Sequence, residues 1–487
     1  MTEITIAWIA LSFFVGFVAY LLPKLSRWFA LSIALISAGY AWLIFAMQSP
    51  LQIELLGNFG VVLAVDRLSA WFILTNAIVT TAVIFYCWQT NKKAFFYMQL
   101  ILLHGSVNAT FICADFISLY VALEVISIAA FLLITYPLTD RTIWVGLRYL
   151  FVSNTVMLFY LVGAIMVYKA NYSFGFSGLA NSPIEAIALI FLGLLAKGGI
   201  FVSGFWLPLT HSESESPVSA MLSGVVVKAG VFPLVRLALM LEAIDPIVRF
   251  FGVATALLGV VYAVFAKDTK RMLAFHTISQ LGFVLAAPAV AGFYAFTHGL
   301  VKSALFLIAG ILPSRNFKEL QHQAIALNVW IALLIASFSI SGFPLLAGFG
   351  AKVLTTKNLL PWQVIAMNIA ALGTAISFAK FIFLPHQNSF AQDSEKKVQF
   401  GFWGAMLILL GGLILANVVY YEAYTIKNII KPLITIAIGW TVYLLIIKKL
   451  TVKLPRAIEQ FEHLIGVMSL TLILLFWTIW ARSQSLI

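Results

Sequence analysis

The chain has 487 residues, of which 62% are hydrophobic and 10% charged, and its mean hydropathy is +1.02. A soluble domain carries about 25% charged residues, so this composition excludes a water-soluble globular protein. The net charge of +12 does not indicate a nucleic-acid partner, because the lysines and arginines are scattered among short loops without a basic stripe. The two cysteines, Cys87 and Cys113, lack metal-ligand spacing, so we expect no metal site and no bound cofactor.

Apolar runs of about 20 residues follow one another along the whole chain, which is the length of a membrane-spanning helix. The runs lack the alternating pattern of barrel strands, and helices and closed barrels are the only structures that satisfy the backbone in lipid. We therefore predict an all-α polytopic transmembrane helical bundle with sixteen spans, at residues 4–22, 27–47, 67–89, 95–113, 115–136, 143–168, 184–206, 217–241, 246–266, 270–290, 293–313, 324–357, 361–384, 399–420, 427–447 and 464–481.

Two of these spans are expected to be broken helices. The span 324–357 is too long for one straight helix and has the sequence SGFP at 341–344 in its middle. The span 184–206 contains the glycine pair 198–199 and Gly204, and either place is a candidate break. Inverted repeats with broken helices are a common plan of transporters, so these two features favour a transport function.

Most loop lysines and arginines fall in one set of alternate loops, called here the lysine-rich side. This side is expected to be cytoplasmic, with both termini outside, because positive residues accumulate in cytoplasmic loops. The N-terminus lacks a basic region, so we expect no cleaved signal peptide. The protein is expected in a bacterial-type plasma membrane or in an energy-transducing organelle or thylakoid membrane. The lysine-rich side carries Lys24, Arg27, Lys92, Lys93, Arg141, Lys267, Lys270, Arg271, Arg315, Lys318, Lys396, Lys397, Lys448, Lys449, Lys453 and Arg456.

A few titratable side chains stand inside the predicted spans, although a charge at mid-bilayer costs roughly 2.5–3.5 kcal/mol on insertion scales. His298 and Lys302 are four residues apart and therefore share one helix face. Lys352 follows the predicted break at SGFP. The candidate set for proton translocation is Glu124, Lys197, Lys228, His276, His298, Lys302 and Lys352.

The residue types in this set favour titration over fixed structural charge. Burial disfavours the charged form of an ionisable group, and lysine can give up its proton whereas arginine keeps it. No arginine stands at the deepest predicted positions. We expect Glu124 and Lys197 to form a pair that a charge at Lys228 biases electrostatically.

Each candidate also has a structural interpretation. Glu124 could clasp two helices, Lys197 and Lys228 could be plain counter-ions, and His276 could be a satisfied interior histidine. Lys380 lies near a helix end and is interpreted as a snorkelling lysine. Three further acids are interpreted as helix caps or interfacial residues, namely Asp66, Asp115 and Asp268.

The stretch KGGIFVSGFWLPLTHSESESPVSAMLSGVVVKAGVFPLVR, residues 197–236, resembles the antiporter-like membrane subunits of respiratory complex I and of the multisubunit Mrp-type cation/proton antiporters. DTKRMLAFHTISQLGF at 268–283, HGLVKSALFLIAG at 298–310 and SGFPLLAGFGAK at 341–352 follow in the family's order. The resemblance covers about residues 115–385, and FHTISQLGF and VKSALFL are most similar to the Mrp-type D subunit.

The resemblance implies a fourteen-helix core with two inverted five-helix repeats and broken helices 7 and 12. Two extra C-terminal helices extend past this core. We expect three N-terminal helices in 1–92, the first repeat in 93–242, the second in 243–385, and C-terminal helices in 386–487. By resemblance, Glu124 and Lys197 are the pair of helices 5 and 7, and Lys228 is the lysine of helix 8. The central hydrophilic axis and its outlet would hold His276, His298, Lys302 and Lys352.

Departures from the family pattern concern the loop after the Trp-Leu-Pro turn. Many complex I relatives have a His before that turn and an Asp after it, where this chain has Gly204 and Leu209. His211 remains as a candidate entrance residue, and the loop HSESESP at 211–217 is unusually acidic. These differences weaken the assignment to complex I.

Three hypotheses remain open from the sequence. The first is a proton-translocating subunit of a multisubunit sodium/proton antiporter, working with other membrane subunits in the lipid bilayer. The second is a membrane subunit of an NAD(P)H–quinone oxidoreductase, whose redox chemistry would reside elsewhere because this chain has no catalytic motif. The third is a stand-alone solute permease, which the row of lysines disfavours.

Overall fold

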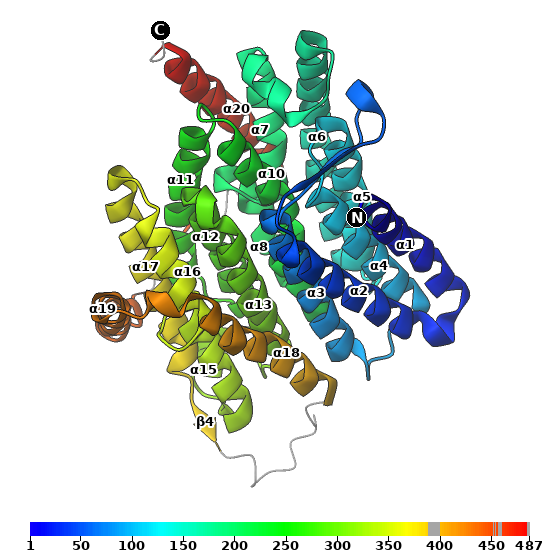
Figure 1. Ribbon diagram of the computed structural model, residues 1–487. Helices are drawn as coiled ribbons and strands as arrows, with labels where there is room; N and C mark the ends of the chain where they lie inside the picture. The colour runs from blue at the N-terminus through cyan, green and yellow to red at the C-terminus, as the bar shows by residue number, and fades with distance from the viewer. Residues whose placement is uncertain (388–399, 451, 453, 456–459, 485–487) are drawn as a thin grey trace.

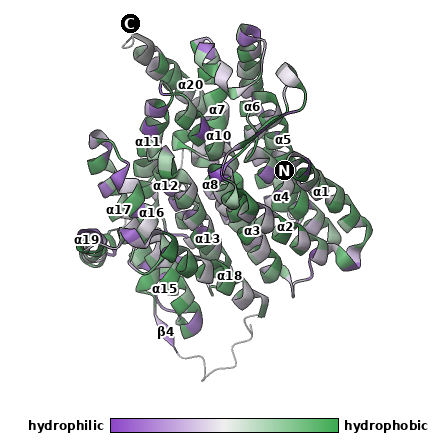
Figure 2. Cartoon of the chain, viewed as in Figure 1, coloured by the Kyte–Doolittle hydropathy of each residue, from purple (hydrophilic) through white to green (hydrophobic). Residues whose placement is uncertain are grey.

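The computed structural model describes residues 1–487 apart from 388–399, 451, 453, 456–459 and 485–487. In the described part, long helices pack into one bundle, and the strands form two short two-stranded pairs (Figure 1). Hydrophobic residues cover most of the length of the helices, as Figure 2 shows. The predicted all-α bundle is therefore confirmed.

The long helices agree closely with the predicted spans. Each of the sixteen predicted spans contains helix, and thirteen helical segments of the described chain are long and apolar enough to cross a membrane by length and composition. The other three spans contain α4, which has 17 residues, the more polar α12, and the divided pair α15 and α16. The helices are α1 (Thr2–Leu21), α2 (Ser26–Ala46), α3 (Arg67–Cys87), α4 (Ala94–Thr110), α5 (Phe116–Ile134), α6 (Asp140–Asn171), α7 (Ile184–Gly198), α8 (Leu207–Glu213), α9 (Ser216–Met221), α10 (Val227–Met240), α11 (Asp245–Phe265), α12 (Thr269–Ala286), α13 (Ala291–Ala309), α14 (Phe317–Leu320), α15 (Leu327–Ser341), α16 (Ala347–Lys357), α17 (Pro361–Ile382), α18 (Phe400–Ala416), α19 (Ile426–Val442) and α20 (Phe461–Gln484).

The strands and short helical turns connect these helices. Strands β1 and β2 pair antiparallel before α3, and β3 and β4 pair parallel beside α15 and α17. The strands are β1 (Leu51–Glu54), β2 (Val62–Val65), β3 (Ile325–Ala326) and β4 (His386–Gln387). The turns are η1 (Pro23–Leu25), η2 (Gly57–Phe59), η3 (Phe176–Asn181), η4 (Phe201–Trp206), η5 (Leu222–Val226), η6 (Pro288–Val290), η8 (Asn417–Ala423) and η9 (Tyr443–Ile447).

Three helices begin at an aspartate, as predicted. The carboxylates of Asp66, Asp115 and Asp268 accept hydrogen bonds from backbone N–H groups in the first turns of α3, α5 and α12. Such a cap satisfies one of the N–H groups that a helix start leaves without a partner. These acids fix helix ends and do not belong to the candidate set for proton translocation.

Both predicted helix breaks are present. α7 ends at Gly198 because Gly199 adopts a left-handed conformation with φ of +69°, and the chain continues through η4 into α8. α15 ends because Gly342 adopts φ of +84°, and α16 begins only at Ala347. Glycine occupies these positions because other residues rarely adopt positive φ. A feature that we did not predict is the π-helical turn η5 between α9 and α10.

The predicted span 427–447 is occupied by α19 and η9, but α19 does not run alongside its neighbours. Figure 1 views α19 almost along its axis, whereas α17, which it contacts, lies close to the plane of the picture. α19 therefore crosses α17. At the crossing, Gly439 lies so close to Ala375 that a methyl group on the glycine would be 2.7 Å from the alanine Cβ.

Candidate functional site

Lys197 and Lys228 flank a point where α7 and α10 touch backbone to backbone. Gly198 and Gly230 approach so closely that a methyl group on Gly230 would lie 2.3 Å from the Gly198 nitrogen. Small residues at helix crossings in membranes permit such an approach. Lys197 precedes Gly198 directly and Lys228 lies two residues before Gly230, so the contact brings both lysines to the same region of the bundle.

The ammonium of Lys197 is held by hydroxyl groups. Lys197 is 5% exposed and its Nζ donates hydrogen bonds to Ser127 on α5 and to Ser153 on α6, the second over 2.6 Å. The two serine oxygens lie 3.0 Å apart and also hydrogen-bond to each other. The lysine therefore joins three helices through a polar cluster that sequence reasoning did not identify, although both serines stand inside predicted spans.

Glu124 and Lys197, which are expected to act as a pair, interact electrostatically but make no direct contact. No contact within 4.0 Å joins a carboxylate oxygen of Glu124 to the Lys197 Nζ, and Glu124 Oε1 is buried without a hydrogen-bond partner. Glu124 is half-buried, and its neighbours Val121 and Ile128 on the same helix are exposed. The carboxyl group therefore lies toward the outer face of α5, while the serine pair holds the amine.

Lys228 lies directly after the π turn η5. Its Nζ donates to the carbonyl oxygen of Gly224 at 2.6 Å and to that of Ser223 at 3.2 Å, and the side chain is 1% exposed. A π turn changes the backbone pairing of a helix, and such turns are frequent at functional sites. Gly299 on α13 faces the amine, since a methyl group there would lie 3.7 Å from Nζ.

The predicted pair His298 and Lys302 lies on α13 in the centre of the bundle. Lys302 is fully buried, and its Nζ donates to the carbonyl oxygen of Leu273 on α12. His298 is also buried, and neither of its ring nitrogens has a hydrogen-bond partner. His276 on α12 likewise has two unpartnered ring nitrogens and packs against Phe378, with 4.7 Å between ring centroids. Buried polar atoms without partners are uncommon and mark places that need an explanation.

A small cavity links His298 to Lys352. Its volume is about 10 Å³, which is room for roughly one water molecule. A water there would have polar neighbours on four helices, which come from α12, α13, α15 and α16. The lining residues are Gln280, Tyr294, Thr297, His298, Val301, Ser339, Ile340, Gly348, Ala351 and Lys352.

Lys352 follows the break between α15 and α16, as predicted. Its Nζ has no hydrogen-bond partner and lies 5.8 Å from the centre of the Phe283 ring. The side chain packs over Gly342, where an added methyl group would lie 2.8 Å from the Lys352 Cδ. The left-handed glycine therefore also makes room for the lysine stem.

Lys380 has a structural explanation. Its Nζ donates to the carbonyl oxygens of Ala266 at 2.8 Å and Ala263 at 3.3 Å, at the C-terminal end of α11. A cation at this position satisfies carbonyls that lack helical partners and interacts favourably with the helix dipole. Lys380 is thus better interpreted as a cap of α11 than as a snorkelling side chain.

His211 lies in α8 on the lysine-rich side and is completely buried. Neither ring nitrogen has a hydrogen-bond partner, and the ring packs edge-on against Phe306 with 5.3 Å between centroids. Lys302 Nζ lies 5.4 Å from the centre of the same Phe306 ring, on α13. The candidate entrance residue and the central lysine therefore both pack against the ring of Phe306.

The expectation that no arginine is deeply buried was wrong. Arg148 on α6 and Arg236 on α10 are only 6% and 7% exposed. Arg236 forms two 3.0 Å contacts with the carboxylate of Asp66. Partial burial raises the pKa of Asp66, but Arg236 and hydrogen bonds from Ser69 outweigh this effect and hold the pKa below its usual value. The ion pair ties α3 to α10.

A second buried polar cluster joins α2, α3 and α4 and was also missed. His104 contacts Thr80 through Nδ1 at 3.0 Å and Ser37 through Nε2 at 2.9 Å. Asn76 donates to the side chain of Asn108 at 2.8 Å. All members are paired, so the cluster is accounted for by packing of these helices. Polar residues inside three predicted spans were the signal available in the sequence.

The arrangement as a whole offers proton-binding groups without acid partners or a metal. The part of the chain that the structure describes has no group of three or more His, Cys, Asp or Glu able to hold a metal ion. Lys197, Lys228 and Lys302 contact only hydroxyl or carbonyl oxygens. Such groups can gain and lose protons, and hydroxyls or water can pass protons between them.

Comparison with known proteins identifies similar chains. Residues 113–377, more than half of the chain, match the family model described as NADH:quinone oxidoreductase/Mrp antiporter, TM. The chain is 27% identical over 394 residues to the D subunit of the Na(+)/H(+) antiporter of Alkalihalophilus pseudofirmus, covering 72% of this chain and 80% of that one. It is also 27% identical over 429 residues to NAD(P)H-quinone oxidoreductase chain 4 2 of Thermosynechococcus vestitus, covering 77% and 79%.

The fold is similar to that of a solved structure. A chain in the structure of the Mrp complex from Dietzia sp. DQ12-45-1b matches with a TM-score of 0.76 and 22% sequence identity. The match covers 99% of this chain and 60% of the other, so the likeness extends through the C-terminal helices that lie outside the predicted core.

Proposed function

Because the chain belongs to the NADH:quinone oxidoreductase/Mrp antiporter transmembrane family, we propose that it is the proton-translocating membrane subunit of a multisubunit sodium/proton antiporter. The observation that carries the proposal is the row of buried amines and imidazoles from Lys197 to Lys352. In the described chain, none of these amines forms an ion pair with a carboxylate.

The surroundings of each amine support a change of proton occupancy. A buried ammonium held only by neutral oxygens lacks the strong compensation that a carboxylate gives, so its neutral form is accessible. Lys197, Lys228 and Lys352 each adjoin an irregular backbone segment, namely the Gly199 turn, the π turn η5 and the Gly342 turn. Such segments can change their hydrogen bonding when the neighbouring charge changes.

Electrostatic repulsion provides the coupling along the row. Two ammonium groups in a medium of low dielectric repel each other strongly, so a proton on Lys228 disfavours one on Lys302 and the reverse. The cavity beside His298 lies between the central residues and Lys352 and has room for one relay water. In this proposal, His276 and His298 pass protons through the centre and Lys352 lies at the outlet.

Glu124 has a different place in this mechanism from the one predicted. It lies one turn before Ser127 on α5, and Ser127 contacts Lys197. We assign Glu124 to proton exchange at the outer face of α5, through the serine pair, rather than to a direct ion pair. The unpartnered Oε1 is the observation that supports this role.

The proposed partners are other membrane subunits, sodium ions and protons. Both the antiporter relative and the chain of the Mrp complex are, by their names, parts of larger assemblies. The break positions also support two five-helix repeats, 93–242 and 243–385, because α7 and α15 end at equivalent left-handed glycines. The three N-terminal helices and the segment 386–487 flank these repeats in the proposal.

The alternative is a proton-pumping membrane subunit of an NAD(P)H–quinone oxidoreductase. The observation that favours it is the relative from Thermosynechococcus vestitus, which has the same identity to this chain over a slightly longer stretch. In that case redox subunits would copurify and NAD(P)H oxidation would drive acidification. A stand-alone permease would instead transport a solute with this chain alone in liposomes.

Proton movement in membrane vesicles that contain the assembled complex decides between these functions. We expect sodium to dissipate a preformed pH gradient at a rate proportional to the amount of complex, without NAD(P)H or quinone. Vesicles without the complex are the control. A gradient that responds to NAD(P)H and not to sodium would replace the antiporter by the oxidoreductase.

A further inference from the structure

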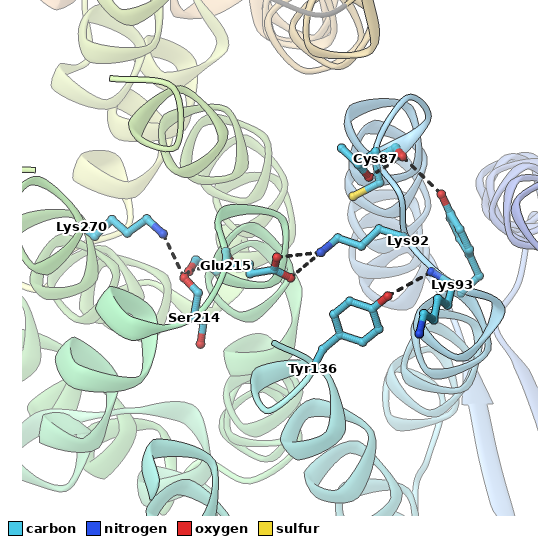
Figure 3. Close-up of polar contacts among 10 residues, drawn as sticks. Cys87, Lys92, Lys93, Tyr136, Ser214, Glu215 and Lys270 are labelled. Carbon is cyan, nitrogen blue, oxygen red and sulfur yellow. Dashed lines mark hydrogen bonds and ion pairs between the residues drawn. The ribbon is translucent and has the colours of Figure 1, made fainter. Parts of the chain in front are cut away.

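The segment that joins α8 to α9, residues 212–216 and called the loop below, is held by basic residues from three separate elements. Lys92, in the connection between α3 and α4, contacts both carboxylate oxygens of Glu215 at 2.6 and 2.7 Å. Lys270, in the first turn of α12, donates to the carbonyl oxygen of Ser214 at 2.9 Å. Figure 3 shows that Lys92 and Lys270 reach the loop from opposite sides.

A third contact comes from the first turn of α6. Arg141 Nε lies 3.6 Å from an oxygen of Glu213. The loop thus carries one acid for α6 and one for the connection between α3 and α4, while α12 binds its backbone. Two of the acidic residues by which this loop departs from the family pattern therefore attach it to other parts of the same chain.

Beneath the loop lies a histidine with no polar partner. His211 is completely buried, and both of its ring nitrogens lack hydrogen-bond partners. Ser212 and Ser214 are also buried, at 1% and 2% exposure, so the loop seals His211 from the lysine-rich side. Behind His211, the ring of Phe306 leads to Lys302, as described above.

The ion pairs that hold the loop are partly exposed to water. The side chains of Glu215 and Glu213 are 34% and 26% exposed, and Arg141 is 56% exposed. Partly exposed ion pairs contribute little free energy and exchange readily with water. Lys92 itself is 12% exposed, and Lys270 holds Ser214 in a buried contact, so only the acidic edge of the loop is held by exchangeable contacts. Release of the two acids would open the loop at this edge, and water entering there would supply the partners that His211 lacks.

We infer that the loop of residues 212–216 closes the aqueous entrance on the lysine-rich side, and that the Lys92–Glu215 contact must break before a proton reaches His211. The inference rests on the proposed function and deepens it by assigning the access step. Lys92 and Glu215 are positioning residues in this step, because they act through the loop and do not carry the proton. The contact also makes access depend on the N-terminal helices, since Lys92 follows α3.

Accessibility of the loop tests this inference independently of transport. Ser212→Cys places a thiol at the buried start of the loop, and a membrane-impermeant thiol reagent is applied from the lysine-rich side of vesicles that hold the assembled complex. Labelling of each cysteine is measured by peptide mass spectrometry, with the buried Cys113 as an internal control. Glu215→Gln is expected to increase the labelling rate of Ser212→Cys by about tenfold or more, because it removes the charge that holds the loop closed.

Two variants control this measurement. Glu242→Gln, which alters an exposed acid after α10, is expected to leave the rate unchanged. The exchange Lys92→Glu with Glu215→Lys restores an ion pair and is expected to restore slow labelling. Equal labelling rates for Glu215→Gln and the parent chain would overturn the inference, whether or not the complex transports sodium.

A reversible bridge tests whether opening is required for transport. Lys92→Cys with Glu215→Cys is joined by a short reducible bis-thiosulfonate reagent, and sodium-dependent proton movement is measured before and after reduction. We expect the bridged complex to lose about 90% of its rate and to recover it on reduction, while either single variant is unaffected by the reagent. Full transport by the bridged complex would overturn the gate. Absence of sodium-dependent proton movement in the unmodified complex would instead refute the proposed function, and the labelling rates would still test the gate.

Discussion

The ammonium of Lys228 lies 2.6 Å from the carbonyl oxygen of Gly224, four residues earlier in the same continuous helical segment. The π turn η5 lies directly before Lys228, and Val227 N–H pairs with the carbonyl of Leu222 five residues back. The irregular turn thus places backbone oxygens within reach of a completely buried amine. A lysine that would otherwise be an unpaired charge gains a weak partner and remains able to lose its proton.

Replacement of Lys228 should therefore stop transport without preventing insertion. We expect Lys228→Ala to reduce sodium-dependent proton movement by about 100-fold or more, because the proton-binding group is lost. Lys228→Arg should be equally inactive, since arginine keeps its proton and cannot relay it. The measurement is the decay of a pH gradient in vesicles, normalised to the amount of assembled complex. Wild-type exchange by Lys228→Arg would show that only a fixed charge is needed there.

The hydroxyl groups of Ser127 and Ser153 should be required for full transport activity. Ser127→Ala together with Ser153→Ala removes both hydroxyls that contact Lys197 and leaves its amine without a partner. We expect transport to fall by roughly tenfold, with a loss of about 1–3 kcal/mol in stability from the unsatisfied group. Glu124→Gln, measured alone and combined with the two serine changes in the same vesicles, completes a double-mutant cycle. Additive effects of the serine and glutamate changes would contradict proton exchange between them.

The contact between Gly198 and Gly230 should be intolerant of any side chain. Gly230→Ala would place a methyl group 2.3 Å from the Gly198 nitrogen, so α7 and α10 must separate. We expect a destabilisation of about 1–3 kcal/mol, measured as a lower denaturation midpoint of the purified complex. Gly411→Ala on α18 is the matched control, because a methyl group there meets no atom within 4 Å. Equal midpoints for the two variants would argue against the close crossing.

Stability should fall in acid because of the ion pair between Asp66 and Arg236. Arg236 lowers the pKa of Asp66 in the folded protein, so the carboxylate contributes stability above its ordinary pKa of 3.8. That contribution is lost as the pH falls through the lowered value, where the folded protein must take up the proton. Asp66→Asn should reduce stability at neutral pH by about 1–3 kcal/mol and flatten the acid dependence below pH 4. The denaturation midpoint of the purified complex as a function of pH checks both effects.

Much of the fold could be predicted because the bilayer acts on the sequence locally. An apolar run of about 20 residues must be a helix wherever it stands, and glycines between the halves of a span permit breaks. The helix caps were also predictable, since Asp66, Asp115 and Asp268 act on their own first turns. The crossing of α19 over α17 was not predictable, because length and composition are the same for a crossing helix and for one that runs alongside.

The sequence by itself determined that lysines stranded in apolar helices are buried, since they have no other place to go. Lys197, Lys228 and Lys302 all lie in the interior, as their positions required. Only the tertiary structure decided what each of them contacts. Ser127 and Ser153 replaced Glu124 as partners of Lys197, and Arg236 was buried against Asp66, because these contacts depend on which faces of distant helices meet. The hydropathy of the sequence indicates which side chains must be buried, whereas helix packing determines which hydrogen-bond or ion-pair partner each of them has.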